Sequence, residues 1–467
     1  MSTQTPAKQD GFKSKWGFIM ACIGSAVGMA NIWRFPYMVA SYGGLTFLLP
    51  YFLFVVLIGM SGVMEEFALG RWGGGPVESF GKATKERWGT SVPGAVLGAL
   101  PVIGAMGLAI GYSVVMGWIF KYTGMSLTGE LYAMGQDMSV IGPTFGAAAP
   151  TVDDGTLLDC IKYMLDGGIF TVGNGIWIVV AVVVSVVIMS LGVAGGIEKA
   201  CKIMIPALFG LFLVLAIYIG FLPGAVDGYK YIFSLNIAGL LDWKLWIYAF
   251  GQAFFSLSVA GNGSVIYGSY LGKDVEISSS ARNVAFFDTL AALVAMMVII
   301  PAMATTGGAL DTAGPGLMFV ALPNVFNGMG VMGRFVGIFF FVAVLFAGVS
   351  SIVNLYETPV AFVQKNLKMN RIVATVLVHV VGLAVALLIQ PWTSQWMDMV
   401  SIYICPFGAA LAGIMFFWVM KKETALEAVN LGANKPIGGW FHPFGKWVYV
   451  PLCIIALIAG AALGGIG

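Results

Sequence analysis

The sequence predicts an all-α membrane protein of eleven transmembrane helices, arranged as two five-helix inverted repeats with discontinuous helices 1 and 6. Three observations support this fold class. Hydrophobic residues make up 59% of the 467 residues and charged residues only 10%, whereas a soluble domain carries about 25% charged residues. Long runs without charge recur along the chain. Two of these runs contain small and polar residues at positions where a lipid-facing helix is apolar.

Eleven runs with little or no charge define the predicted spans, and each is near or above the ~20 residues that cross the hydrocarbon core. The sequence has no series of segments of about ten residues with alternating polarity, the pattern typical of a membrane β-barrel. The predicted spans are 16–33, 35–64, 88–120, 167–197, 203–226, 245–272, 289–310, 335–356, 372–397, 399–420 and 447–467.

The spans group into one transmembrane domain over residues 1–467. We expect the first repeat at about 12–223, the inverted repeat at about 243–420 and helix 11 at about 445–466. The tail before span 1 is basic, and further Lys and Arg residues follow every even-numbered span. Because cytoplasmic loops are enriched in both residues, we expect a cytoplasmic N-terminus, and the odd span count puts Gly467 outside.

Composition and motifs argue against other classes of function. The net charge of +2 gives no basic footprint for nucleic acid. The five cysteines form no CxxC pair, and His379 and His442 are interpreted as structural. No HExxH motif, nucleophile–base pair or Gly-rich phosphate loop is recognisable. We therefore expect no enzyme and no nucleic-acid partner.

Spans 1 and 6 are unusual for helices in lipid. Span 1 contains Gly24, Ser25, Gly28 and Asn31, and the run 251–263 in span 6 is similarly rich in glycine, serine and amide side chains. Close packing through glycine would explain either segment alone. The two segments lie five spans apart, however, as equivalent helices of two inverted repeats do, and substrate sites lie between such discontinuous helices.

A helix break supplies the groups that bind a zwitterion. Half-helix N-termini offer N–H donors and a positive dipole end to a carboxylate, and unwound carbonyls offer oxygens to a cation. In span 8, Ser350 and Ser351 are either helix–helix contacts or oxygen ligands for a cation. Asp288, near the start of span 7, is either a functional acid at membrane depth or a solvated charge at the helix end.

The run Asn31-Ile32-Trp33-Arg34-Phe35-Pro36-Tyr37 resembles the signature of the neurotransmitter:sodium symporter family, in its bacterial eleven-helix branch with a leucine-transporter-like fold. The likeness covers nearly the whole chain, including residues 42–44, 66–71 and 196–199, the centre of span 6 and the span 8 serines. It implies sodium-coupled symport of a neutral amino acid by alternating access, in the plasma (inner) membrane of a prokaryote.

The resemblance implies two sodium sites. The first would use the substrate carboxylate together with Ala26, Asn31, Ser256 and Asp288. The second would use the carbonyls of Gly24, Val27 and Ala347 and the hydroxyls of Ser350 and Ser351. A sodium ion that touches the carboxylate would stabilise the substrate electrostatically, so each ligand would raise the affinity for the other.

The resemblance also implies the substrate site. Amides at Met29 and Ala30 with the Tyr112 hydroxyl would hold the carboxylate. The amine would meet carbonyls at the two breaks and the Ser258 hydroxyl. Tyr112 with Phe255, and Arg34 with Asp398, would form the outer gate. The full substrate-facing set is Ser25, Ala26, Gly28, Met29, Ala30, Leu108, Tyr112, Phe255, Ser256, Ser258, Gly261, Ile352 and Leu355.

Several positions depart from the family pattern. Asp288 stands where many relatives carry Asn, and Ala292 where chloride-dependent relatives carry Ser, so we expect a fixed carboxylate to replace chloride. Gly28 stands where amine-selective relatives carry an acid, which favours a substrate with its own carboxylate. Lys365 stands where relatives carry the Asp of the inner gate.

The apolar wall of Leu108, Ile352 and Leu355 and the room left by Gly261 favour a medium or large neutral side chain, hydrophobic or aromatic. The alternative is a proton-coupled or exchange-type amino-acid transporter of related broken-helix fold, in which Asp288 relays protons. A channel is disfavoured because a small occluded site suits binding and release. No oligomeric state is predicted.

Overall fold

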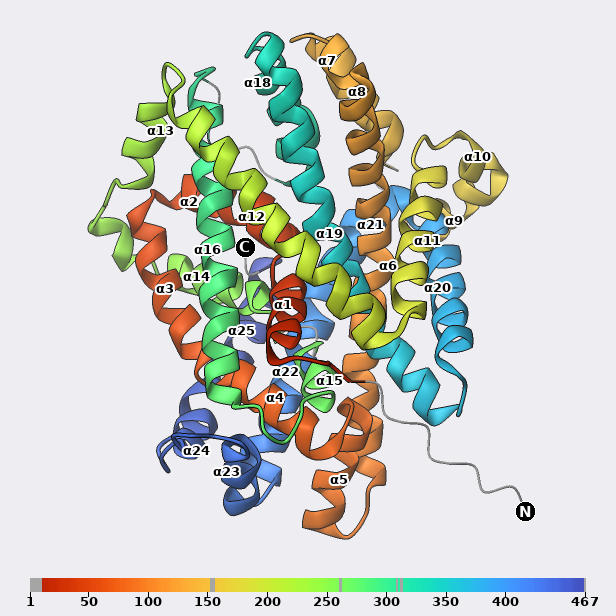
Figure 1. The fold of residues 1–467 in the computed structure, drawn as a ribbon, viewed down its shortest axis with the longest axis vertical. Helices are drawn as coiled ribbons and strands as arrows, with labels where there is room; N and C mark the ends of the chain where they lie inside the picture. The colour runs from red at the N-terminus through yellow and green to blue at the C-terminus, as the bar shows by residue number, and fades with distance from the viewer. Residues whose placement is uncertain (1–10, 152–155, 260–262, 308–309, 311–313, 466–467) are drawn as a thin grey trace.

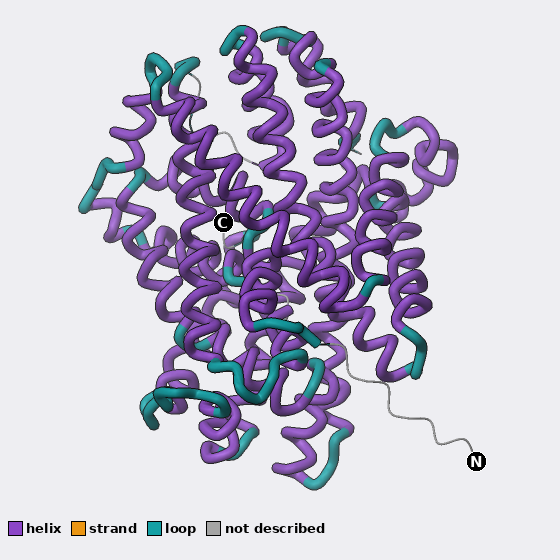
Figure 2. Tube along the Cα trace, in the orientation of Figure 1, coloured by secondary structure: helices purple, strands orange, loops and turns teal. Residues whose placement is uncertain are grey.

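The computed structural model describes residues 11–151, 156–259, 263–307, 310 and 314–465. The described chain is helical with connecting loops and contains no strand (Figure 2). The helices of the first half of the chain are α1 (Lys15–Ala26), α2 (Phe35–Tyr42), α3 (Leu45–Gly59), α4 (Gly62–Gly73), α5 (Pro76–Trp88), α6 (Val92–Thr128), α7 (Glu130–Ala133), α8 (Met138–Ala148), α9 (Leu157–Tyr163), α10 (Ile169–Thr171), α11 (Gly175–Ser190), α12 (Glu198–Gly220) and α13 (Ala225–Ile232).

The remaining helices lie in the second half of the chain. They are α14 (Trp243–Ser256), α15 (Gly263–Ser269), α16 (Ile277–Ala304), α17 (Gly314–Gly316), α18 (Leu322–Asn327), α19 (Val331–Asn366), α20 (Arg371–Leu388), α21 (Thr393–Asp398), α22 (Cys405–Ile414), α23 (Lys422–Asn430), α24 (Phe441–Phe444) and α25 (Val450–Leu463). Figure 1 shows α5, α23 and α24 at one end of the bundle and α7 and α18 at the other.

Within the described residues, eight helices are long and apolar enough to cross a membrane, and ten spans result if each of two bent helix pairs counts once. The bent pairs are Lys15–Ala26 with Ala30–Tyr42, at 57°, and Leu157–Thr171 with Gly175–Ser190, at 88°. The predicted sixth span corresponds to the two shorter helices α14 and α15. These helices are consistent with the predicted architecture of eleven spans.

Several predicted boundaries are wrong, because apolar runs do not show where the backbone turns. The first span extends past Arg34 through α2, and the second begins at Leu45, since Gly43 and Gly44 have φ of 83° and 55° and reverse the chain between them. The fourth span begins at Gly175 and not at 167, beyond a kink at Gly167. The seventh begins at Ile277 and not at 289.

Glycines let the inner half of the sixth span approach the second span closely. A Cβ on Gly70 of α4 would lie 1.9 Å from the Val265 carbonyl oxygen of α15, and a Cβ on Gly268 would lie 2.5 Å from the Phe67 carbonyl oxygen. Only glycine fits both positions without moving backbone. The two helices therefore pack backbone to backbone, as small residues allow in membrane bundles.

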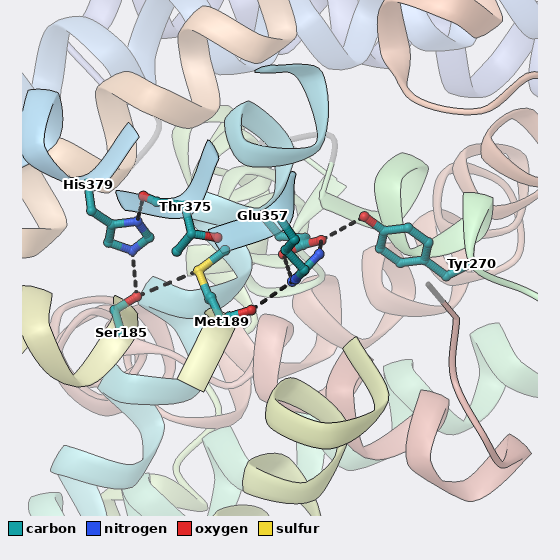
Figure 3. Close-up of polar contacts among 7 residues, drawn as sticks. Ser185, Met189, Tyr270, Glu357, Thr375 and His379 are labelled. Atoms are coloured by element: carbon teal, nitrogen blue, oxygen red, sulfur yellow. Dashed lines mark hydrogen bonds and ion pairs between the residues drawn. The ribbon is translucent and has the colours of Figure 1, made fainter. Parts of the chain in front are cut away.

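Buried polar groups connect α11, α19, α20 and Tyr270, the residue that follows α15 (Figure 3). Arg371 forms two hydrogen bonds with the fully buried Glu357 carboxylate, at 3.0 and 2.8 Å, and Tyr270 donates to the same carboxylate at 2.6 Å. Beside this pair, the His379 ring nitrogens lie 2.9 Å from Ser185 Oγ and 2.8 Å from the Thr375 carbonyl oxygen. Both nitrogens have partners, which agrees with a structural histidine.

We predict that Arg371→Leu destabilises the fold, because it leaves the buried Glu357 carboxylate without its cation. Removing one partner of a buried ion pair costs about 3–5 kcal/mol. A clearly lower melting temperature of the purified protein in detergent is expected. The control is Lys230→Leu, since the Lys230–Asp227 pair is solvent-exposed and exposed pairs contribute little. Equal melting temperatures for the two variants would contradict the prediction.

Candidate substrate and ion site

Two interrupted helices meet at the centre of the bundle. The α-helical part of the first span ends at Ala26 and the chain bends before the π-helical turn Ala30–Arg34. In the sixth span, α14 ends at Ser256 and α15 begins at Gly263. Ser258 adopts φ of 56°, a left-handed conformation that few residues other than glycine adopt. Both spans are therefore interrupted.

Side-chain hydrogen bonds join the two breaks to their surroundings. Ser258 Oγ donates to the Ser25 carbonyl oxygen at 2.8 Å, which links the sixth span to the first. The Met29 amide donates to the Tyr112 hydroxyl of α6 at 3.4 Å. Gln252 Nε2 donates to the Ala30 carbonyl oxygen at 3.2 Å. Backbone groups that a continuous helix would pair internally thus have side-chain partners.

A cavity of about 350 Å³ lies between these breaks, α6, α19 and α21. Its wall is mainly apolar and aromatic, with hydroxyl and amide groups near the breaks. Ten of the thirteen predicted substrate-facing residues line it: Ser25, Ala26, Gly28, Met29, Ala30, Leu108, Tyr112, Phe255, Ser258 and Leu355.

The other three predicted substrate residues lie elsewhere or outside the description. Ser256 is fully buried and faces Asp288 behind the cavity wall. Ile352 is 1% exposed and packs in the apolar core. Gly261 lies outside the described residues, and the room beside it stays a prediction.

Three of the four residues predicted for the first ion site form one buried cluster. Asn31 Nδ2 donates to Asp288 Oδ1 at 2.8 Å, to the Asp288 carbonyl oxygen at 3.2 Å and to Ser256 Oγ at 3.1 Å. Ser256 Oγ donates to Asp288 Oδ2 at 2.7 Å. All three side chains are fully buried. Ala26, the fourth predicted residue, lines the adjoining cavity.

This cluster corrects the position expected for Asp288. Because α16 begins twelve residues earlier than the predicted span, Asp288 lies well inside the helix and is fully buried. The interpretation as a solvated helix-end charge is therefore wrong. A carboxylate at such depth requires hydrogen-bond donors or a cation, and Asn31 and Ser256 supply donors.

The residues predicted for the second ion site also lie together. Ser351 Oγ donates to the carbonyl oxygens of Gly24 at 3.3 Å and Val27 at 3.2 Å, at the end of α1. Ser350 Oγ donates to the Ala347 carbonyl oxygen at 2.9 Å within α19. Three carbonyl and two hydroxyl oxygens thus gather where α1 ends against α19. Such oxygens are the ligands that hard cations prefer.

The predicted outer gate residues surround the mouth of the cavity. The Arg34 guanidinium lies over the Phe255 ring, 5.0 Å from its centroid. Arg34, Phe255 and Asp398 line both the central cavity and a second cavity of about 260 Å³. Tyr112 lines the central cavity but not the second one. Three of the four predicted gate residues therefore lie where the two cavities adjoin.

A third cavity, of about 630 Å³, opens at the other end of the bundle and shares Thr358 with the central one. Lys365, the departure at the inner gate, lies in its wall and pairs with Glu78 at 3.4 Å.

Sequence reasoning missed several residues of the central cavity. Trp33, Trp118 and Met397 contribute to its apolar wall, and Thr393, Ser394 and Ser401 lie toward α21. The most informative omission is Asn354, which lies in the wall one turn from the span 8 serines. An amide at mid-membrane depth on the same helix face was the available signal.

Comparisons with known proteins agree with this geometry. A model of the sodium:neurotransmitter symporter family matches residues 9–141 and 160–459. An uncharacterised sodium-dependent transporter of Bacillus subtilis is 29% identical over 97% of this chain and 97% of its own. The sodium-dependent nutrient amino acid transporter 1 of Drosophila grimshawi is 25% identical over 94% of this chain and 74% of its own.

A solved structure extends the likeness to three dimensions. The crystal structure of MhsT in complex with L-phenylalanine matches with a TM-score of 0.78 and 30% identity, over 97% of this chain and 100% of that chain. The predicted fold class is confirmed, and so is the prediction of a transporter and not an enzyme.

We predict that Gly28→Val abolishes the stabilisation of the protein by sodium. A Cβ at Gly28 would lie 2.9 Å from Ser351 Oγ and 3.4 Å from the Tyr112 hydroxyl, so a branched side chain displaces both. Bound ligands raise the melting temperature by mass action. We therefore expect sodium to raise the melting temperature of the wild type but not that of Gly28→Val.

The matched control is Gly210→Val on α12, because a Cβ there meets no atom within 4 Å. This variant should keep the sodium-induced rise. A rise of wild-type size in Gly28→Val would show that the position does not border an ion site.

Proposed function

The chain belongs to the sodium:neurotransmitter symporter family and is a sodium-dependent transporter, and we propose that it carries out symport of a neutral, hydrophobic or aromatic amino acid by alternating access. The observation that carries this proposal is the meeting of two broken helices around a cavity of about 350 Å³. Beside that cavity lie two groups of oxygen atoms suited to a hard cation.

The first sodium ion is proposed to bind between Asn31, Ser256 and Asp288. Asn31 Nδ2 already contacts three oxygens of the other two residues at 2.8–3.2 Å. A cation can replace these amide hydrogens if the Asn31 side chain presents its oxygen instead. The ion would then lie beside the cavity and neutralise both Asp288 and a substrate carboxylate, which couples the two ligands.

The second sodium ion is proposed to bind the oxygens of Gly24, Val27, Ala347, Ser350 and Ser351. The Ser351 hydroxyl now bridges two carbonyl oxygens at the end of α1. An ion there would take over these carbonyls and hold α1 against α19. Occupancy of this group would thus favour one arrangement of the two helices, as a conformational switch requires.

The substrate is proposed to bind through its zwitterionic end. Its carboxylate would meet the Met29 and Ala30 amides, at the start of the second half of span 1, and the Tyr112 hydroxyl, which now accepts from the Met29 amide at 3.4 Å. Its amine would meet carbonyls at the two breaks. Leu108, Trp118 and Leu355 line the cavity as an apolar wall, which suits a large neutral side chain.

We predict that purified protein binds one or more neutral amino acids in sodium and none in potassium. A screen of the twenty amino acids by thermal shift and by competition for a radiolabelled ligand tests this, with uptake into proteoliposomes under a sodium gradient. Binding in potassium, or uptake driven by an acid external pH without sodium, would favour proton coupling or exchange through Asp288 and contradict the proposal.

Chloride is proposed to play no part in transport. Asp288 supplies a fixed negative charge within the first ion group, and Ala292, one turn later on α16, offers no hydroxyl to an anion. A unit charge at about 4 Å from a cation contributes ~1–4 kcal/mol at effective dielectric constants between 80 and 20. This carboxylate can therefore compensate the charge of sodium without an added anion.

We predict that replacing chloride by gluconate leaves wild-type uptake unchanged. Asp288→Asn should raise the sodium concentration for half-maximal uptake about tenfold, as the loss of ~1.4 kcal/mol implies. The double variant Asp288→Asn with Ala292→Ser should regain uptake in chloride but not in gluconate. Wild-type uptake that stops in gluconate would refute chloride independence.

We also propose the orientation of the protein in the membrane, from the distribution of Lys and Arg. Arg71, Lys82 and Lys85 belong to α4 and α5, and Lys421 and Lys422 lie at the start of α23. Figure 1 shows α5 and α23 at the same end of the bundle. This end would face the cytoplasm of a prokaryotic cell at the inner membrane, with the N-terminus inside and the C-terminus outside.

A further inference from the structure

Asn354 of α19 lies in the wall of the central cavity, and only one of the two polar atoms of its side-chain amide has a hydrogen-bond partner among the described residues. The residue is buried, with 3% of its surface exposed. Nδ2 donates to the Ser25 hydroxyl at the end of α1. Oδ1 has no hydrogen-bond partner among the described residues. A buried acceptor left without a donor costs about 1–3 kcal/mol, so this oxygen needs an explanation.

The amide is held in place from two sides. Ser25 binds its nitrogen, and Gly263, the first residue of α15, packs against it: a Cβ there would lie 2.8 Å from Nδ2 and 3.3 Å from Oδ1. The amide therefore sits where both broken helices approach α19. Its orientation is set by the bond to Ser25, and that bond leaves the carbonyl oxygen as the group available to the cavity.

The groups that would bind the main chain of an amino acid are other residues. The Met29 amide and the Tyr112 hydroxyl serve the carboxylate, and the Ser258 region serves the amine, as proposed above. The same cavity wall contains Leu108 and Trp118, which offer an apolar surface. An oriented acceptor such as Asn354 Oδ1, together with this apolar surface, matches an apolar side chain that carries one donor.

We propose that Asn354 Oδ1 accepts a hydrogen bond from the side chain of the substrate. The substrate class is then a neutral amino acid with a large apolar side chain that bears an N–H or O–H donor, such as an indole or a phenol. This inference rests on the proposed function and narrows it. A site built to accept a hydrogen bond discriminates against an isostere without the donor, because its own buried group is then unpaired.

Thr358 provides a matched control for Asn354. Its Oγ1 is also buried without a partner among the described residues, and it lies one turn beyond Asn354 in the wall shared with the third cavity. No bond to α1 orients it in the way that Ser25 orients Asn354. If unpaired polar atoms in the wall served only to bind water, both residues would contribute. If Asn354 recognises the substrate side chain, only the Asn354 variant should lose the preference.

The experiment compares isosteric ligand pairs by competition binding in sodium: tyrosine with phenylalanine, and tryptophan with 3-benzothienylalanine, in which sulfur replaces the indole N–H. In wild type the donor-bearing member should bind about tenfold more tightly in each pair, as ~1.4 kcal/mol implies. In Asn354→Leu the ratio should fall to about one while phenylalanine still binds. In Thr358→Val the ratio should persist.

Three results would overturn the inference: equal binding within both pairs in wild type, a preference that survives in Asn354→Leu, or its loss in Thr358→Val but not in Asn354→Leu. If Asn354→Leu is not folded by melting temperature, Ser25→Ala takes its place, because loss of the anchor should also reduce the ratio. Failure of every amino acid to bind in sodium would instead reject the proposed function. Binding without a donor preference would reject this inference alone.

Discussion

The structure depends on the loss of continuous backbone hydrogen bonding in the first and sixth spans. In lipid, each freed peptide group must find another partner. Here side chains supply them: Ser351 reaches the Gly24 and Val27 carbonyls, Ser258 reaches the Ser25 carbonyl, and the Tyr112 hydroxyl meets the Met29 amide. A net hydrogen bond is worth only about 0.5–1.5 kcal/mol. The proposed sodium ions and zwitterion would therefore replace these internal partners at modest cost.

Helix α19 organises much of the rest. Ser350 and Ser351 face the end of α1, Asn354 lies in the cavity wall, and Glu357 holds Arg371 at the end of the bundle. Ser351, Asn354 and Glu357 follow one another at intervals of three residues, and Ser350 is four residues before Asn354, so they lie along one side of the helix. A shift of α1 against this side of α19 would therefore alter the proposed second ion site, the wall of the central cavity and the surroundings of the buried ion pair together.

Much of the fold and site follows from the sequence alone. The scarcity of charge fixes lipid as the solvent, the apolar runs give the spans, and glycine with polar residues at 24–31 and 251–263 identifies the two interrupted helices. These features are local in sequence. The resemblance to the symporter family then brought together Asn31, Ser256 and Asp288, and the structure places these three in one buried cluster.

Only the tertiary structure decided where helices begin and which polar atoms lack partners. Hydropathy cannot distinguish a lipid-facing run from a turn between two apolar helices, so the reversal at Gly43 and Gly44 and the early start of α16 were missed. The sequence marks Asn354 as an amide on the helix face of the span 8 serines, but it does not show that Oδ1 has no hydrogen-bond partner among the described residues. The role of Asn354 depends on Ser25 and Gly263, which lie far from it in sequence. Sequence thus determined the solvent and the chemistry of the breaks, whereas packing decided which groups face the cavity.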